Sequence, residues 1–93
     1  MEYKKGVKKM YVEAFASKLK KARTEAGFTQ REVEKETGIT QSVLARYETG
    51  KLEPNIETLG TLADFYIVST DWLIGTKGGK SPFHEISTRN AGI

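Results

Sequence analysis

The segment 29–50 contains two helix starts and two helix stops, and this punctuation limits the fold more than any other feature of the sequence. Thr29 and Glu32 form the T-x-x-E pattern of a capping box, which begins a helix. Gly38 ends that helix, because glycine adopts the left-handed conformation of a C-terminal cap at little cost. Thr40 is a candidate N-cap for a second helix, which runs to the end of the segment. The segment therefore predicts two short helices joined by a tight turn.

Two further stretches have apolar residues at the three- and four-residue spacing of a helix. In the first they are Val12, Phe15, Leu19, Ala22 and Ala26. In the second, which Asn55 can cap, they are Ile56, Leu59, Leu62, Ala63 and Tyr66. Gly60 in this second helix suggests a close helix contact. A short helix at DWLI, capped by Ser69 or Thr70 and closed by Gly75, completes an all-α, compact five-helix bundle without a strand signal.

The chain has 93 residues, enough for one small domain. We expect this domain at 11–75. A basic N-terminal arm, 1–10, precedes it, and a C-terminal tail, 76–93, follows it. The tail contains Gly, Ser and Pro but little periodicity, so we expect it to be flexible.

The net charge of +3 is unevenly distributed along the chain. Residues 1–23 have eight Lys and Arg side chains against two acidic ones, whereas residues 24–74 have four against nine. Residues 75–93 have three against one. Basic charge is thus concentrated ahead of the predicted helix pair, and a polyanionic partner would be attracted mainly there.

Several function classes find no support in the sequence. There is no cysteine and no apolar run near the ~20 residues of a membrane span, and the N-terminus lacks the apolar stretch of a signal peptide, so we expect a cytoplasmic protein. His84 is the only histidine, which gives no metal site. No nucleophile has a paired base and no Gly-rich loop could cradle a phosphate. We therefore expect no enzyme activity, no cofactor and no small-molecule substrate.

The two faces of the predicted helix 40–49 differ in chemistry. Leu44 and Tyr47, with Ile39 in the turn before them, form an apolar set that fits a core-facing side. The remaining positions bear hydroxyls, one amide and one guanidinium: Thr40, Gln41, Ser42, Arg46 and Thr49. A solvated helix is usually rich in Glu and Lys, so this face suggests contact with another molecule. Two helices with a short Gly-containing turn describe a helix-turn-helix, whose second helix enters the major groove of DNA.

The stretch FTQREVEKETGITQSVLARYETGKLEP resembles the Cro and phage-repressor family, also called the xenobiotic-response-element (XRE) family. The resemblance extends from about Phe15 to Gly75 and includes the closing VSTDWLIG. It implies a lambda-repressor-like DNA-binding domain that acts as a transcriptional regulator, and a repressor of the prophage or mobile-element type fits best. It also implies a double-stranded DNA operator with two half-sites and a homodimer, whose contact we expect around Trp72 and Ile74.

The resemblance also implies roles for individual residues. The implied base-reading residues are Gln41, Ser42, Val43 and Arg46. Gln suits adenine, Arg suits guanine, and Val43 fits a thymine methyl group. The implied phosphate contacts, which position the protein without specifying sequence, are Gln30, Thr40, Thr49 and Lys51. Gln30 would also brace Gln41, and Arg23 with Glu48 would form a structural salt bridge.

Two positions depart from the family pattern, and several residues have a second interpretation. The family usually has a small residue where Glu34 stands and an apolar one where Thr37 stands, so Glu34 either tilts outward or changes the angle between the helices. The polar residues of helix 40–49 also fit a plain solvated helix start. The arm lysines fit either a solvated tail or an arm on the DNA backbone or minor groove: Lys4, Lys5, Lys8 and Lys9. An antitoxin-like module that binds a protein partner as well as DNA is the alternative function.

Overall fold

The computed structural model describes residues 9–76, and within them the chain forms five α-helices and no strand. The helices are α1 (Met10–Ala26), α2 (Gln30–Thr37), α3 (Gln41–Glu48), α4 (Ile56–Tyr66) and α5 (Thr70–Ile74). The all-α, five-helix prediction is therefore confirmed for this part of the chain. The tail after Thr76 and all of the arm except its last two residues lie outside the described residues.

The caps that the sequence predicts begin each of the last four helices. Thr29 and Glu32 form both bonds of the capping box, since each side chain accepts from the other residue's backbone N–H. The side chains of Thr40 and Asn55 accept from backbone N–H groups in the first turns of α3 and α4. Of the two candidate caps for α5, Ser69 is the one that accepts, from the backbone N–H of Trp72 over 3.0 Å.

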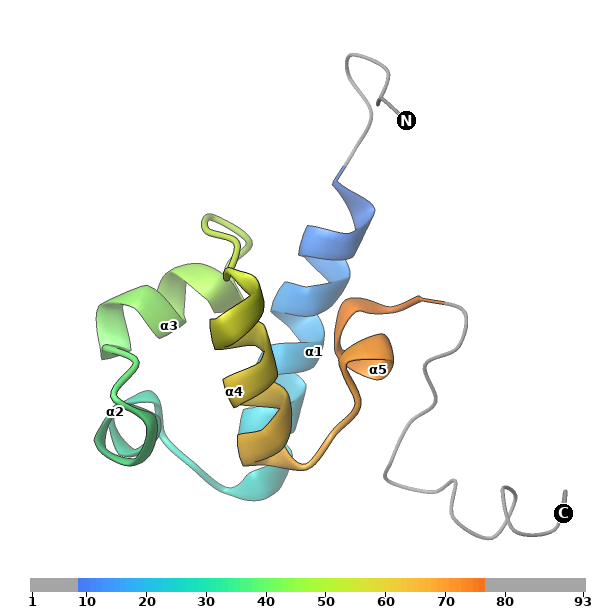
Figure 1. Ribbon diagram of the computed structural model, residues 1–93. Coiled ribbons are helices and arrows are strands. Elements are labelled where there is room, and N and C mark those ends of the chain that lie inside the picture. The colour runs from blue at the N-terminus through green and yellow to red at the C-terminus, as the bar shows by residue number, and fades with distance from the viewer. Residues whose placement is uncertain (1–8, 77–93) are drawn as a thin grey trace, which may run out of the picture.

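The helices α3, α4 and α5 all pack against α1, and α2 packs on α3 (Figure 1). The α2–α3 pair lies on one side of α1, and α5 lies on the other. Five side chains are almost completely removed from water and form the centre of the core: Leu19, Val33, Leu44, Leu62 and Leu73. The apolar faces of α1, α2 and α3 thus meet in one core, which leaves the opposite face of α3 exposed.

Three expectations about burial and packing are wrong. Ala26 is exposed, and Ile56 is 87% exposed, because both stand at a helix terminus beyond the core. A Cβ at Gly60 would meet no atom within 4 Å, so this glycine makes no close helix contact. Trp72, for which the sequence allows either a core position or a dimer contact, is 5% exposed and belongs to the core, and Ile74 is half-buried.

The residue that ends α4 is Ile67, which has a left-handed backbone with φ 56° and is 84% exposed. A β-branched residue rarely adopts this conformation, because its Cβ crowds the neighbouring carbonyl. Its backbone N–H nevertheless donates to the carbonyl of Asp64, and the N–H of Val68 donates to the carbonyl of Ala63, as at a helix that ends in glycine. The chain therefore accepts local strain to turn from α4 into α5.

Candidate nucleic-acid interface

The turn between α2 and α3 is closed by Thr37 and Gly38. Gly38 has φ 82°, the predicted left-handed conformation, and its N–H donates to the carbonyl of Glu34 over 2.8 Å. The Thr37 hydroxyl donates to the carbonyl of Val33 and accepts from the N–H of Ile39. A polar residue at position 37 is therefore accommodated, since its hydroxyl satisfies two backbone groups of the turn.

The faces of α3 are divided as the sequence predicts. Leu44 is fully buried and Tyr47 nearly so, which anchors the helix to α1 and the core. Ser42 and Arg46 are exposed on the opposite side, and Gln41 is half-buried beside α2. Val43, the remaining predicted base reader, packs partly against the core and lies at the edge of the outward face.

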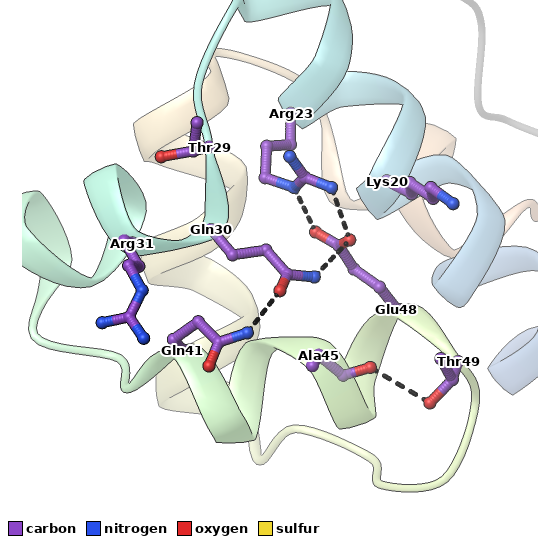
Figure 2. Close-up of a pocket in the computed structure, with 9 residues that line it drawn as sticks. All are labelled: Lys20, Arg23, Thr29, Gln30, Arg31, Gln41, Ala45, Glu48 and Thr49. Atoms are coloured by element: carbon purple, nitrogen blue, oxygen red, sulfur yellow. Dashed lines mark hydrogen bonds and ion pairs between the residues drawn. The ribbon is translucent and has the colours of Figure 1, made fainter.

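A chain of hydrogen bonds connects α3 to α2 and α1 (Figure 2). The Gln41 side-chain N–H donates to the Gln30 side-chain oxygen over 2.8 Å. The Gln30 side-chain nitrogen donates to Glu48 Oε1 over 3.0 Å. The guanidinium of Arg23 binds the same carboxylate through two nitrogens, at 2.7 and 3.0 Å. The predicted Arg23–Glu48 salt bridge and the predicted brace between Gln30 and Gln41 are both present.

The salt bridge is shielded from water, with side-chain exposures of 13% for Arg23 and 3% for Glu48. The hydrogen bonds with Glu48 raise the pKa of the Arg23 guanidinium, which stays charged. A further Arg23 N–H donates to the carbonyl of Phe28 over 2.9 Å, so this side chain also fixes the loop before α2. The Tyr66 hydroxyl is buried and has no hydrogen-bond partner among residues 9–76. Burial, together with the charge of Glu48, raises the pKa of Tyr66 to about 12.

The residues predicted to contact phosphates differ in how much of their hydrogen-bonding capacity is used. The Thr40 oxygen accepts from the N–H of Val43, and its own proton stays available to a phosphate. The Thr49 hydroxyl donates to the carbonyls of Ala45 and Arg46, so it must rotate to donate to a phosphate. Lys51 is exposed.

Three residues outside the predicted base-reading and phosphate-contacting sets lie at the same surface. An open groove between α1, α2 and α3 has Lys20, Arg31 and Ala45 among its lining residues (Figure 2). Lys20 and Arg31 add two cations that are separate in sequence. Ala45 follows Gln41 by one turn of α3 and presents a methyl group. Helical spacing along α3 could have revealed Ala45. Lys20 and Arg31 line one groove only because α1 and α2 both pack against α3.

Residues 9–76 do not meet the requirements of a membrane-spanning helix or of a metal site. No described helix combines the length and the apolar character that a membrane span requires. The described residues also include no group of three or more His, Asp or Glu side chains placed to hold a metal ion.

A short helix, a tight turn at a left-handed glycine, and a second helix with its polar face outward define the helix-turn-helix class of DNA-binding fold. Residues 19–73 match the family model described as Helix-turn-helix, and the chain belongs to that family. The resemblance to Cro and phage repressors, first seen in the residues of α2 and α3, is thereby confirmed.

Three relatives, all from Bacillus subtilis (strain 168), align with most of the chain. The SPbeta prophage-derived uncharacterized HTH-type transcriptional regulator YonR is 41% identical over 69 residues, 74% of this chain and 62% of that protein. The HTH-type transcriptional regulator ImmR is 39% identical over 62 residues, 67% and 49% of the two chains. The uncharacterized HTH-type transcriptional regulator YqaE is 31% identical over 71 residues, 76% and 61%. This chain thus spans about half to three-fifths of the length of these relatives.

Proposed function

We propose that the protein is a sequence-specific, double-stranded DNA-binding transcriptional regulator, and that it represses by covering a promoter. The observation that carries this proposal is the outward face of α3, where short polar side chains stand on a helix braced from α1 and α2. The names of the relatives support regulation over the antitoxin-like alternative, and the name of YonR supports a prophage or mobile-element setting. A protein with this function acts on the chromosome, so we expect it in the cytoplasm.

Base reading depends on the groups that the free chain leaves unused. Gln30 occupies one amide proton of Gln41, which leaves a second proton and the oxygen. This donor and acceptor match N7 and the N6 amino group of adenine. Arg46 is exposed further along α3 and suits guanine, and Ser42 suits several bases. Because Val43 packs partly against the core, Ala45 is the better placed residue for a thymine methyl group.

Binding to the DNA backbone involves residues of α1 and α2, the two residues that cap α3 and the loop after it. The predicted phosphate contacts are Gln30, Thr40, Thr49 and Lys51. We add Lys20 and Arg31, since they line the same groove as Gln30 and Gln41. Together these phosphate contacts would fix the position of α3 in the major groove, and the contacts of α3 side chains with the bases would give the sequence preference.

A single chain presents one recognition helix, so we propose a homodimer on an operator with two half-sites. In place of Trp72, the dimer surface is an apolar groove between the start of α1, α4 and α5, with Val12, Leu59 and Ile74 among its lining residues. Tyr11 lines the same groove and is 55% exposed. Sedimentation equilibrium tests this surface: Tyr11→Glu should shift the protein to monomer and weaken binding to two half-sites more than to one half-site.

The experiment that tests the function is selection of bound sites from random double-stranded DNA. We expect a short, two-fold symmetric sequence, and we expect Gln41→Ala to lose the preference at one base pair in each half-site. Binding to all sequences with equal affinity would contradict the proposed function. Placing the selected sequence inside a promoter should then lower transcription in the presence of the protein, which tests repression separately.

A further inference from the structure

Glu34, which departs from the small residue usual in the family, bonds directly to the recognition helix. Its Oε1 accepts from the backbone N–H of Gln41 over 2.8 Å. Gln41 is the first residue of α3, and backbone N–H groups in the first turn of a helix lack partners within the helix. Of the two expected outcomes for Glu34, an outward tilt does not occur, since the side chain is half-buried and turned to α3.

Glu34 and Gln30 bind two different groups of Gln41, its main-chain amide and its side-chain amide. They lie four positions apart on α2, which places them on one face of that helix. Gln30 accepts from the side-chain amide of Gln41, and Glu34 accepts from its main-chain amide. We name these two contacts the Gln41 clamp. A side chain held at its base and at its tip has few orientations left, so the clamp limits which base edge Gln41 can reach.

We propose that Glu34 is a positioning residue that sets the base preference of Gln41, which rests on the proposed DNA-reading function. The carboxylate acts through the hydrogen bond to the backbone and does not touch the bases itself. It also carries a negative charge near the start of α3, where the helix dipole stabilises it and where DNA phosphates would be repelled. The two effects predict different results, because the bond changes base preference and the charge changes affinity for every sequence alike.

Three substitutions separate the hydrogen bond from the charge. Glu34→Gln keeps the length and an acceptor oxygen but removes the charge. Glu34→Asp keeps the charge but shortens the side chain by one methylene, so that it no longer reaches the amide of Gln41. Glu34→Ala removes both. Glu36 is exposed on the same helix, so Glu36→Gln and Glu36→Ala are matched controls for the loss of charge.

The clamp is tested first without DNA, by amide hydrogen exchange of Gln41 measured by NMR. In Glu34→Ala and Glu34→Asp the Gln41 amide should exchange about tenfold faster, as expected for loss of one hydrogen bond to a charged acceptor. Glu34→Gln should exchange at a rate between those of these variants and the parent protein, because its neutral oxygen is a weaker acceptor than a carboxylate. The two Glu36 variants should stay close to the parent protein. An unchanged exchange rate in both Glu34→Ala and Glu34→Asp would show that Glu34 does not hold Gln41.

The effect on base preference is tested with operators changed at the base pair that Gln41→Ala identifies. The parent protein and the Glu36 variants should discriminate against the changed operator equally, and Glu34→Gln should keep most of this discrimination. Glu34→Ala and Glu34→Asp should lose about tenfold of this discrimination. Discrimination that follows charge, with Glu34→Asp like the parent and Glu34→Gln like Glu34→Ala, would overturn the positioning role.

The test also distinguishes this proposal from the one on which it rests. If the parent protein shows no base preference, the proposed function fails and the positioning role fails with it, while the exchange rates still decide whether the clamp exists. If the parent protein has a preference and Glu34→Ala matches Glu36→Ala in discrimination, the positioning role alone is wrong. Thermal melts of each variant confirm that the compared proteins are folded.

Discussion

In the free protein the side-chain amide of Gln41 donates a hydrogen bond of 2.8 Å to the side-chain oxygen of Gln30. Gln30 is itself held by Glu48, and Glu48 is held by Arg23 of α1. The amide that would face the bases is therefore oriented by a chain of contacts that ends in the first helix (Figure 2). Such preorganisation lowers the entropy cost of binding, because the side chain does not have to be ordered when DNA arrives.

Replacing Gln30 with Ala should loosen this orientation. We expect a loss of about 1 kcal/mol in specific binding and a weaker preference at the base pair read by Gln41, since one hydrogen bond to that side chain is removed. Titration of operator variants by fluorescence anisotropy measures both quantities. Arg31→Ala is the control on the same helix, because it should weaken all sequences alike. Equal behaviour of the two variants would mean that Gln30 contributes only to backbone binding.

Replacing Arg46 with Ala should weaken specific binding by about 1–3 kcal/mol and relax the preference at one base pair in each half-site, because the variant cannot form the bidentate pair with guanine. Lys51→Ala is the matched comparison and should weaken specific and random DNA equally. Competition binding with operator and random duplexes distinguishes them. A decrease in affinity for Arg46→Ala that is the same on both duplexes would remove Arg46 from the base-reading residues.

Replacing Arg23 with Ala should lower the free energy of unfolding by about 3–5 kcal/mol, because the carboxylate of Glu48 would be left buried without its partner. Urea unfolding of Arg23→Ala, Glu48→Ala and the double variant gives the interaction free energy. We expect the double variant to lose less than the two single variants together. An interaction free energy near zero would contradict a stabilising role for the pair.

Replacing Tyr66 with Phe should raise the free energy of unfolding by about 1 kcal/mol near neutral pH, because it removes a buried hydroxyl without a partner. The raised pKa of Tyr66, about 12 against about 10 for an exposed tyrosine, adds a pH dependence. Because folding raises this pKa, the unfolded chain loses the Tyr66 proton at a lower pH than the folded protein does. The free energy of unfolding is therefore at its full value below pH ~10 and falls as the pH rises toward about 12.

Urea unfolding of the parent protein and Tyr66→Phe between about pH 8 and pH 11 tests this, since the tyrosine ionises over that range when unfolded. The advantage of the Phe variant should grow with pH, because other titrating groups are the same in both proteins. A difference between the two that stays constant across the range would contradict the raised pKa.

Deleting residues 1–8 should reduce affinity for DNA at low salt and leave the preferred sequence unchanged. The deletion removes Lys4, Lys5 and Lys8, which lie outside the described residues, and keeps Lys9, whose Nζ lies 3.3 Å from Glu53. The plot of log affinity against log salt should flatten by about 0.9 for each phosphate that the shortened protein no longer neutralises. A changed preference at A·T pairs beside the half-site would instead indicate minor-groove reading, and an unchanged slope would assign these lysines to a solvated tail.

Local signals in the sequence determine most of the described fold. The caps at Thr29, Thr40 and Asn55 act on N–H groups within three residues, so they identify helix starts without any knowledge of packing. The outward position of Ser42 and Arg46 follows equally from helical spacing and from the burial of Leu44. The sequence wrongly predicted that Ile56 is buried, because it lies at the end of a row of apolar residues that extends past the core. Helical spacing does not show where the surface that covers such a row ends.

The tertiary structure decided which of these side chains act together. The three- and four-residue spacing of apolar residues correctly predicted that Leu62 is buried. It cannot show that Lys20 and Arg31 line one groove, because these residues lie on different helices. The direction of Glu34 depends on the angle between α2 and α3, which results from the packing of the whole core. Capping and periodicity act over a single helical turn, whereas these contacts join separate helices, and only close packing of the folded chain fixes their geometry.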